Sequence, residues 1–237
     1  MSDRQRELDR LVTELAGNPD YASGRRSFPR TVTADDAMAI TRGLHQQIEQ
    51  GTAAREAVAT REGLRMGCTR GCNTCCEELI MVHLPEALLV AEWLRLPENA
   101  AILAGFRERY PAWRARVGDL PTEVEALSAR GDLLGLEKIF TTRASARNLC
   151  AFNVGGDCTV YETRPTVCRT ANAVDDASKC GLYDVSQGRR QALAFVPLDQ
   201  FVERSSQLVR ALHHAVAGRK APRRPLCELV WEMTGEV

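Results

Sequence analysis

Eight of the nine cysteines in this chain fall into two groups. The first group is compressed into the segment CTRGCNTCC, and the second follows after a long stretch of helical character. Thiolates held close together repel one another unless a cation compensates their charge, and sulfur ligands without neighbouring histidine select Zn²⁺ or iron–sulfur clusters. We therefore expect all eight to be metal ligands. They are Cys68, Cys72, Cys75 and Cys76 in the first group, and Cys150, Cys158, Cys168 and Cys180 in the second.

The adjacent pair Cys75–Cys76 bears on the kind of metal centre. Neighbouring side chains diverge by about 100° in a helix and point to opposite faces in a strand, so an adjacent pair chelates one tetrahedral ion awkwardly. A zinc ribbon needs two C-x₂-C knuckles, and this chain has one, between Cys72 and Cys75. We therefore favour an iron–sulfur cluster slightly over zinc. One centre or two are both open, and a single centre could take cysteines from each group.

Other uses of these cysteines stay open as alternatives. The thiols could be buried as small apolar groups, or paired in structural disulfides if the compartment is oxidising. The spacing of Cys68, Cys72 and Cys75 also matches the three-cysteine motif of radical S-adenosylmethionine enzymes, although the repeated βα units of those enzymes are absent. We expect Cys227, the ninth cysteine, to be a core thiol on the apolar face of the last helix.

The histidines of the chain have ordinary explanations. We expect His83 to be a partly buried histidine and at least one of His213 and His214 to be solvated. The sequence contains no nucleotide-binding glycine loop, no serine triad and no H-E-x-x-H motif. A more standard enzyme is therefore not indicated.

Composition and charge narrow the class of protein. The chain has 237 residues, of which 44% are hydrophobic and 26% charged, as is typical of globular proteins. Its 31 basic side chains balance 31 acidic ones, which excludes a strongly basic nucleic-acid binder. No apolar run reaches the roughly 18 residues of a membrane span, and the segment MSDRQRELDR lacks the apolar core of a secretory signal. We expect a cytoplasmic protein without membrane contact.

Helical periodicity dominates the elements that must position the cysteines. Pro111 is expected to kink or split its helix. Residues 149 to 190 are expected to be irregular, with short β-prone pieces. The expected helices cover residues 8–15, a stretch from Thr33 to a break at Gly51, a second stretch to Glu62, a helix from Pro85 to Leu96, residues 98–118, residues 121–148, a helix after Pro197, and residues 226–233.

The cysteine-rich run ending in CC and the later segment CAFNVGGDCTVYETRPTVCR together resemble the YkgJ-type cysteine-cluster family. The more specific motif is C-x-x-Y-x-x-R-P-x-x-C-R, with one cysteine before it and one after it. The resemblance covers about residues 65 to 182. The family's first motif is C-x-x-C-x-x-C-C, whereas three residues separate Cys68 from Cys72 here. The second motif is matched by Cys150, Cys158, Tyr161, Arg164, Pro165, Cys168, Arg169 and Cys180.

The resemblance implies a zinc- or iron-chelating domain, because members of the family are described in these terms. A related domain occurs in an iron–sulfur-dependent flagellin lysine methylase, so an enzymatic activity is one implication. Arg164 and Arg169 flank Cys168, and their charges would offset that of a thiolate cluster. We therefore expect both arginines to bind the cofactor. The alternative is that they pair with surface carboxylates such as Glu162.

These observations predict a mainly α fold, in which helices surround an irregular, cysteine-rich, loop-built metal-binding core. The expected organisation is an N-terminal helical extension (1–64), a cysteine-cluster domain (65–182) and a C-terminal helical segment (183–237) packed on it in one compact unit. The expected function is to bind an iron–sulfur cluster or zinc through thiolates, with no reaction assigned. Alternatives are an iron–sulfur-dependent enzyme that modifies proteins, as a lysine methylase does, and a thiol-redox protein using Cys75 and Cys76. A protein partner or substrate is left open.

Overall fold

The computed structural model describes residues 31–63, 71–142, 150–170, 183–184, 189–190, 196–219 and 221–235. Within these ranges the chain is mainly helical with a few short strands, as predicted. The predicted helix over residues 8–15 and the predicted ligands Cys68 and Cys180 lie outside the described residues. None of the described helices combines the length and the apolar character that a membrane crossing requires.

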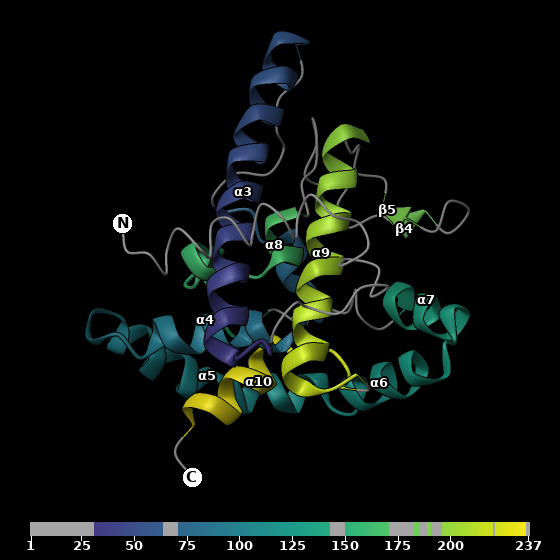
Figure 1. Ribbon diagram of the computed structural model, residues 1–237. Helices are drawn as coiled ribbons and strands as arrows, with labels where there is room; N and C mark the ends of the chain where they lie inside the picture. Colours follow the sequence, from purple (N-terminus) through teal and green to yellow (C-terminus); the bar gives the residue numbers. More distant parts are fainter. Residues whose placement is uncertain are drawn as a thin grey trace.

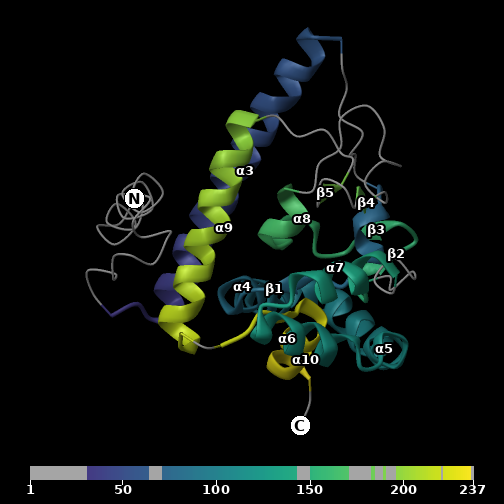
Figure 2. The same ribbon diagram turned by 90° about the vertical axis from the view of Figure 1, so that its right-hand side faces the viewer.

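The described elements are helices, with a few short antiparallel strand pairs between them in space (Figures 1 and 2). The helices are α3 (Ala34–Arg61), α4 (Leu84–Leu94), α5 (Ala100–Val117), α6 (Leu120–Arg130), α7 (Leu133–Thr142), α8 (Thr166–Thr170), α9 (Val196–Ala217) and α10 (Leu226–Thr234). The 3₁₀ turns are η1 (Thr74–Glu77), η2 (Pro97–Asn99) and η3 (Tyr161–Thr163). The strands pair as β1 (Met81–Val82) with β6 (Arg224–Pro225), β2 (Asn153–Val154) with β3 (Asp157–Cys158), and β4 (Tyr183–Asp184) with β5 (Arg189–Arg190). These pairs are too short to bury a face, so the helices supply the hydrophobic core.

Helix α3 begins where the sequence predicts. The Thr33 hydroxyl accepts a hydrogen bond from the Asp36 N–H at 3.1 Å, and the Asp36 carboxylate accepts one from the Thr33 N–H at 3.2 Å. Two orphan donors of the helix start are satisfied in this way. The predicted apolar stripe of α3 is buried, and it consists of Ala37, Ile40, Leu44 and Ile48.

The predicted break at Gly51 is wrong, because α3 continues through it to Arg61. The Thr52 hydroxyl donates to the Ile48 carbonyl one turn back at 3.0 Å, as threonines inside helices do. One glycine costs a helix only about 1 kcal/mol. Burial of the stripe on the preceding turns outweighs that cost.

Pro85, Pro111 and Gly131 have different effects on where the middle helices begin and end. Pro85 lies in the first turn of α4, as predicted. The helix predicted over residues 121–148 is divided into α6 and α7, because Gly131 takes a φ of 67°, which glycine adopts without a steric penalty. Pro111 does not split α5, which is continuous around it.

The buried apolar side chains form two clusters. The small cluster lies between α3 and α9, which run side by side in Figures 1 and 2. The main cluster draws on α4, α5, α6 and α10, together with the segment that begins at Cys150. Helix α4 contacts α5 and α10 as well as α3 and α9, so it joins the two parts. The small cluster consists of Ala37, Ile40, Leu44, Leu208, Val209 and Leu212.

Candidate functional site

The two cysteine groups are joined through the backbone. The N–H of Cys150 donates to the carbonyl oxygen of Cys76 at 2.8 Å. Cys76 lies in η1, where its own N–H donates to the Asn73 carbonyl at 2.8 Å. The CC pair and the first cysteine of the second group therefore lie next to each other, although helices α4 to α7 separate them in the sequence. The backbone of Cys75 is described but its side chain is not.

Cys150 also anchors the hairpin that carries Cys158. The Cys150 carbonyl accepts a hydrogen bond from the Asn153 N–H at 2.8 Å, and Asn153 pairs with Cys158 across the β2–β3 ladder. The turn of the hairpin contains Gly155 and Gly156, with φ values of 62° and 99°. These left-handed conformations favour glycine. They allow a turn tight enough to keep Cys158 near Cys150.

The tip of this hairpin touches the first cysteine group. A β-carbon on Gly156 would lie 3.5 Å from the carbonyl oxygen of Gly71, and one on Gly71 would lie 3.7 Å from a carboxylate oxygen of Asp157. Gly71 precedes Cys72, and Asp157 precedes Cys158. The two groups therefore approach each other at a second point.

Cys227 is a buried core thiol, as predicted, with 2% of its surface exposed. It is nevertheless close to a cysteine of the second group, because the Sγ atoms of Cys150 and Cys227 lie 3.7 Å apart. No spacing rule links two residues that are 77 positions apart in sequence. The sequence therefore carried no signal for this contact.

The metal-ligand prediction is not tested by these contacts. Among the residues whose side chains are described, no three Cys, His, Asp or Glu side chains are grouped as a metal ion would require. The side chains of Cys68, Cys75 and Cys180 lie outside that set. The eight-cysteine ligand set therefore stays a prediction.

Arg164 and Arg169 converge on one carboxylate from helix α3. Arg164 donates to Glu49 Oε1 at 3.1 Å, and Arg169 donates to the same oxygen. Arg169 also donates to the carbonyls of Arg164 at 2.7 Å and of Glu162 at 2.5 Å. The acidic partner of both arginines is thus Glu49, whereas Glu162 contributes its backbone carbonyl. The prediction that the arginines face a cofactor is not tested.

Two guanidinium groups flank Cys168 in the sequence. Those of Arg164 and Arg169 both pair with the carboxylate of Glu49. Burial lowers the pKa of Arg169, while Glu49 and, more weakly, Cys168 raise it. The guanidinium of Arg164 also stacks 3.6 Å over the ring centre of Tyr161. A thiolate at Cys168 would be stabilised by a neighbouring guanidinium.

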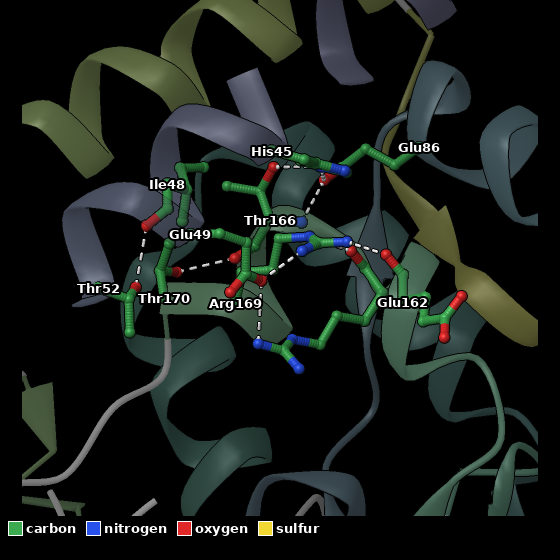
Figure 3. A network of polar contacts seen from close by, with 10 residues as sticks. His45, Ile48, Glu49, Thr52, Glu86, Glu162, Thr166, Arg169 and Thr170 are labelled. Atoms are coloured by element: carbon green, nitrogen blue, oxygen red, sulfur yellow. Dashed lines mark hydrogen bonds and ion pairs between the residues drawn. The ribbon is translucent and has the colours of Figure 1, made fainter. Parts of the chain in front are cut away.

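A second polar site, for which the sequence contains no local signal, is centred on Glu86 (Figure 3). The Glu86 carboxylate accepts hydrogen bonds from the N–H groups of His83 at 3.0 Å and Thr166 at 2.7 Å. The Nε2 atom of His45 lies 3.1 Å from the Thr166 hydroxyl and 3.9 Å from Glu86 Oε1. The exposed fractions of Glu86, Thr166 and His45 are 3%, 4% and 5%. This network therefore links α3, α4 and α8 in the interior and does not meet solvent.

The ionisation of this network follows from its burial. Burial raises the pKa of Glu86, but the nearby His45 ring and the backbone N–H of His83 outweigh it and lower that pKa to about 2. Burial lowers the pKa of His45, and Glu86 offsets this only in part. His45 is therefore neutral near pH 7. Glu86 is charged near pH 7, and the backbone N–H groups of His83 and Thr166 donate to its carboxylate.

His83 and His213 lie beside this network, with ring centres 5.2 Å apart. His213 is buried, and its Nδ1 accepts a hydrogen bond from the Leu84 N–H at 3.0 Å. Its Nε2 lies 2.9 Å from the carbonyl of Ala221, which can only accept, so Nε2 donates and the ring is neutral. His83 is partly buried, as predicted. Burial lowers its pKa to about 4.

Comparison of the chain with protein-family models, with curated proteins and with solved structures found no match. The resemblance to the YkgJ-type family therefore rests on the two motifs alone.

Proposed function

We propose that this protein binds a metal centre through the thiolates of its two cysteine groups, with an iron–sulfur cluster slightly favoured over zinc, and that it does so in the cytoplasm. The observation that carries the proposal is the hydrogen bond between the Cys150 N–H and the Cys76 carbonyl. A metal centre built from distant segments requires their backbones to meet. This bond joins the CC pair to the second group.

The surroundings of the cysteines support the same proposal. The β2–β3 hairpin brings Cys158 toward Cys150 and sets its tip against Gly71. Arg164 and Arg169 bring two positive charges next to Cys168 in the sequence, and a cluster with several thiolates needs such compensation. We assign both arginines the role of offsetting the charge of the centre. Metal ligation would then contribute to folding, because the unfolded chain does not hold the ligands together.

Anaerobic purification followed by elemental analysis and visible spectroscopy tests the proposal. A brown protein that bleaches with dithionite and contains iron and acid-labile sulfide would support a cluster. A colourless protein with stoichiometric zinc would support the zinc alternative. A folded protein without bound metal, whose stability is unchanged by a chelator, would refute the proposal.

Serine variants test the assignment of the ligands. We expect Cys168→Ser to lower the metal content and the solubility, because it removes a predicted ligand next to the arginine pair. Cys227→Ser is the control, because Cys227 is buried in the main cluster and is outside the predicted ligand set. Equal metal loss in both variants would show that the assignment of the cysteines is wrong. A methylase-like activity, redox activity of Cys75 and Cys76, and a protein partner stay predictions.

A further inference from the structure

Cys150 and Cys227 form a pair of sulfurs in direct contact. Their Sγ atoms lie 3.7 Å apart, which is the van der Waals separation of two thiols. The sulfurs of a disulfide lie about 2.05 Å apart. A bond between them requires an approach of roughly 1.7 Å.

Hydrogen bonds anchor the backbone on both sides of this contact. Cys150 is held by the Cys76 carbonyl and by the Asn153 N–H. On the other side, the N–H of Leu226, the residue before Cys227, donates to the Ile80 carbonyl at 2.9 Å. The pairing of β1 with β6 leads directly into α10 and fixes where that helix begins. The two sulfurs are therefore brought together by independent tethers.

The two thiols differ in their access to solvent. Cys227 is only 2% exposed and belongs to the main cluster. Cys150 is partly exposed and packs on the edge of that cluster. We therefore expect a dissolved oxidant to react with Cys150 first. Cys227 is then the nearby thiol that can react in a second step.

We propose that Cys150 and Cys227 are a site of reversible oxidation, in which a small disulfide such as oxidised glutathione is the oxidant. The Cys150 thiolate attacks one sulfur of the oxidant, which forms a mixed disulfide and releases one glutathione thiolate. The Cys227 thiolate then attacks the Cys150 sulfur, which forms the protein disulfide and releases the second glutathione. The two protein thiols lose two protons and two electrons, and the small disulfide gains both.

The bond joins the cysteine-rich segment to helix α10. It closes a loop between residues 77 positions apart, which restricts the unfolded chain more than the folded one. The oxidised protein therefore unfolds at a higher urea concentration than the reduced protein. Oxidation also withdraws the Cys150 thiolate from metal binding, a consequence that rests on the proposed function.

Disulfide mapping of the full chain tests this site. The reduced protein, with and without prior treatment with a chelator, is exposed to oxidised glutathione, alkylated and digested with trypsin. No lysine or arginine lies between Cys150 and Cys158, and trypsin does not cleave the Arg164–Pro165 bond, so Cys150, Cys158 and Cys168 stay on one peptide. Fragmentation of that peptide must assign the bridged sulfur. We expect a bridge between Cys150 and Cys227 in the chelator-treated sample. Recovery of Cys227 as an alkylated thiol in both samples would overturn the proposal.

Three variants test the order of the two steps. Cys227→Ser should retain one glutathione on Cys150, because the second step cannot occur. Cys150→Ser should leave Cys227 unmodified, because Cys227 is buried. Cys158→Ser is the matched control on the same peptide and should form the bridge as the wild type does.

Two outcomes separate this proposal from the metal proposal. Absence of glutathione from Cys150 in Cys227→Ser, or its presence on Cys227 in Cys150→Ser, would contradict the mechanism. A chain that binds no metal and still forms the bridge would refute the metal proposal and support this one. Circular dichroism checks the fold of each variant, and the wild-type map decides the result for any variant that does not fold.

Discussion

The two hydrophobic clusters of this protein are built from different kinds of contact. The small cluster is a single seam between α3 and α9, and its fully buried members are aliphatic. The main cluster joins several helices and holds stacked rings: Phe106 on Phe152, and Tyr110 on Trp231, each with ring centres 4.3 Å apart. All three tryptophans of the chain lie in the main cluster or against it, and they are Trp93, Trp113 and Trp231.

The region between the clusters is polar. Glu86 of α4 is bonded to α8 through Thr166 and lies beside His45 of α3. Apolar contacts tolerate small displacements, whereas a buried carboxylate needs its own donors in place. We therefore expect the two parts to separate when the Glu86 network is broken, and to unfold together when only an apolar side chain is lost. Tryptophan fluorescence reports on the main cluster, and far-ultraviolet circular dichroism reports on all helices.

The largest effect is expected from Phe106→Ala, at about 4 kcal/mol of unfolding free energy. The Phe106 ring is fully buried and stacked on Phe152, so its loss leaves a cavity in the main cluster. Urea unfolding measures the change, and the fluorescence and dichroism transitions should shift together. Leu134→Ala is the control, because Leu134 is 79% exposed and should change stability by less than about 0.5 kcal/mol. If Phe106→Ala shifts the fluorescence transition and leaves the dichroism transition unchanged, the two clusters do not unfold together as we expect.

Glu86→Gln should cost about 3 kcal/mol and should also separate the two transitions. The glutamine side chain keeps one oxygen that can accept a hydrogen bond. Its NH₂ group faces the second backbone N–H, so two donors meet and that hydrogen bond is lost. Helicity should then be lost at a lower urea concentration than the tryptophan signal. Glu92→Gln, on the same helix, is the control. Its exposed pair with Arg42 should contribute less than about 1 kcal/mol.

If the dichroism and fluorescence transitions of Glu86→Gln coincide, this interpretation of the polar region is wrong. Coincident transitions would mean that the contacts of α4 with α3 and α9 couple the clusters without the carboxylate.

Acidification should weaken the polar region, by on the order of 2 kcal/mol between about pH 6.5 and pH 4. Burial outweighs the attraction of Glu86 and lowers the pKa of His83 from 6.5 to about 4. Within this window the unfolded chain binds more protons than the folded chain, so the unfolding free energy falls as the pH falls and recovers as the pH rises. Urea unfolding across the window measures the slope.

His83→Gln should reduce that slope. The pKa values of His45 and His213 are also lowered by burial, so part of the slope should persist. An unchanged slope in His83→Gln would show that the titration of His83 does not contribute.

The smallest effect is expected from Thr33→Ala, at about 1 kcal/mol, because the α3 start loses the hydroxyl that accepts the Asp36 N–H. Because the Glu86 network is intact in this variant, the dichroism and fluorescence transitions should shift together. Thr33→Ser keeps the hydroxyl and should be close to the wild type. An equal loss in both variants would contradict a capping role.

Local patterns predicted much of the helical fold. The Thr33 cap, Pro85 at the start of α4 and the buried Leu226 and Val230 of α10 all depend on residues within a turn or two of each other. The predicted break at Gly51 failed because the apolar stripe before it, visible in the same sequence, outweighs the cost of one glycine. The low helix propensity of Gly51 therefore counted for less than the burial of the apolar stripe of α3.

Contacts between distant segments could not be predicted from the sequence. Nothing in the order of residues says that Glu86 meets Thr166, 80 positions away, or that Cys150 meets Cys227. The sequence left open whether the two cysteine groups share one metal centre. The hydrogen bond between the Cys150 N–H and the Cys76 carbonyl brings the groups together, while the ligand set itself stays a prediction.

Helix α10, which directly follows the β6 strand, comes late in the chain, and this affects how the chain folds while it is being synthesised. Residues on α10 complete the main cluster, whose other members lie much earlier in the sequence. Arg95 and Met233, for example, share a hydrogen bond although they are 138 positions apart. Until α10 emerges from the ribosome, the parts of α4 and α5 that pack on α10 have no partner. Such a nascent chain exposes hydrophobic surface for much of its translation, and a chaperone that holds it should raise the yield of folded protein more than slower synthesis does.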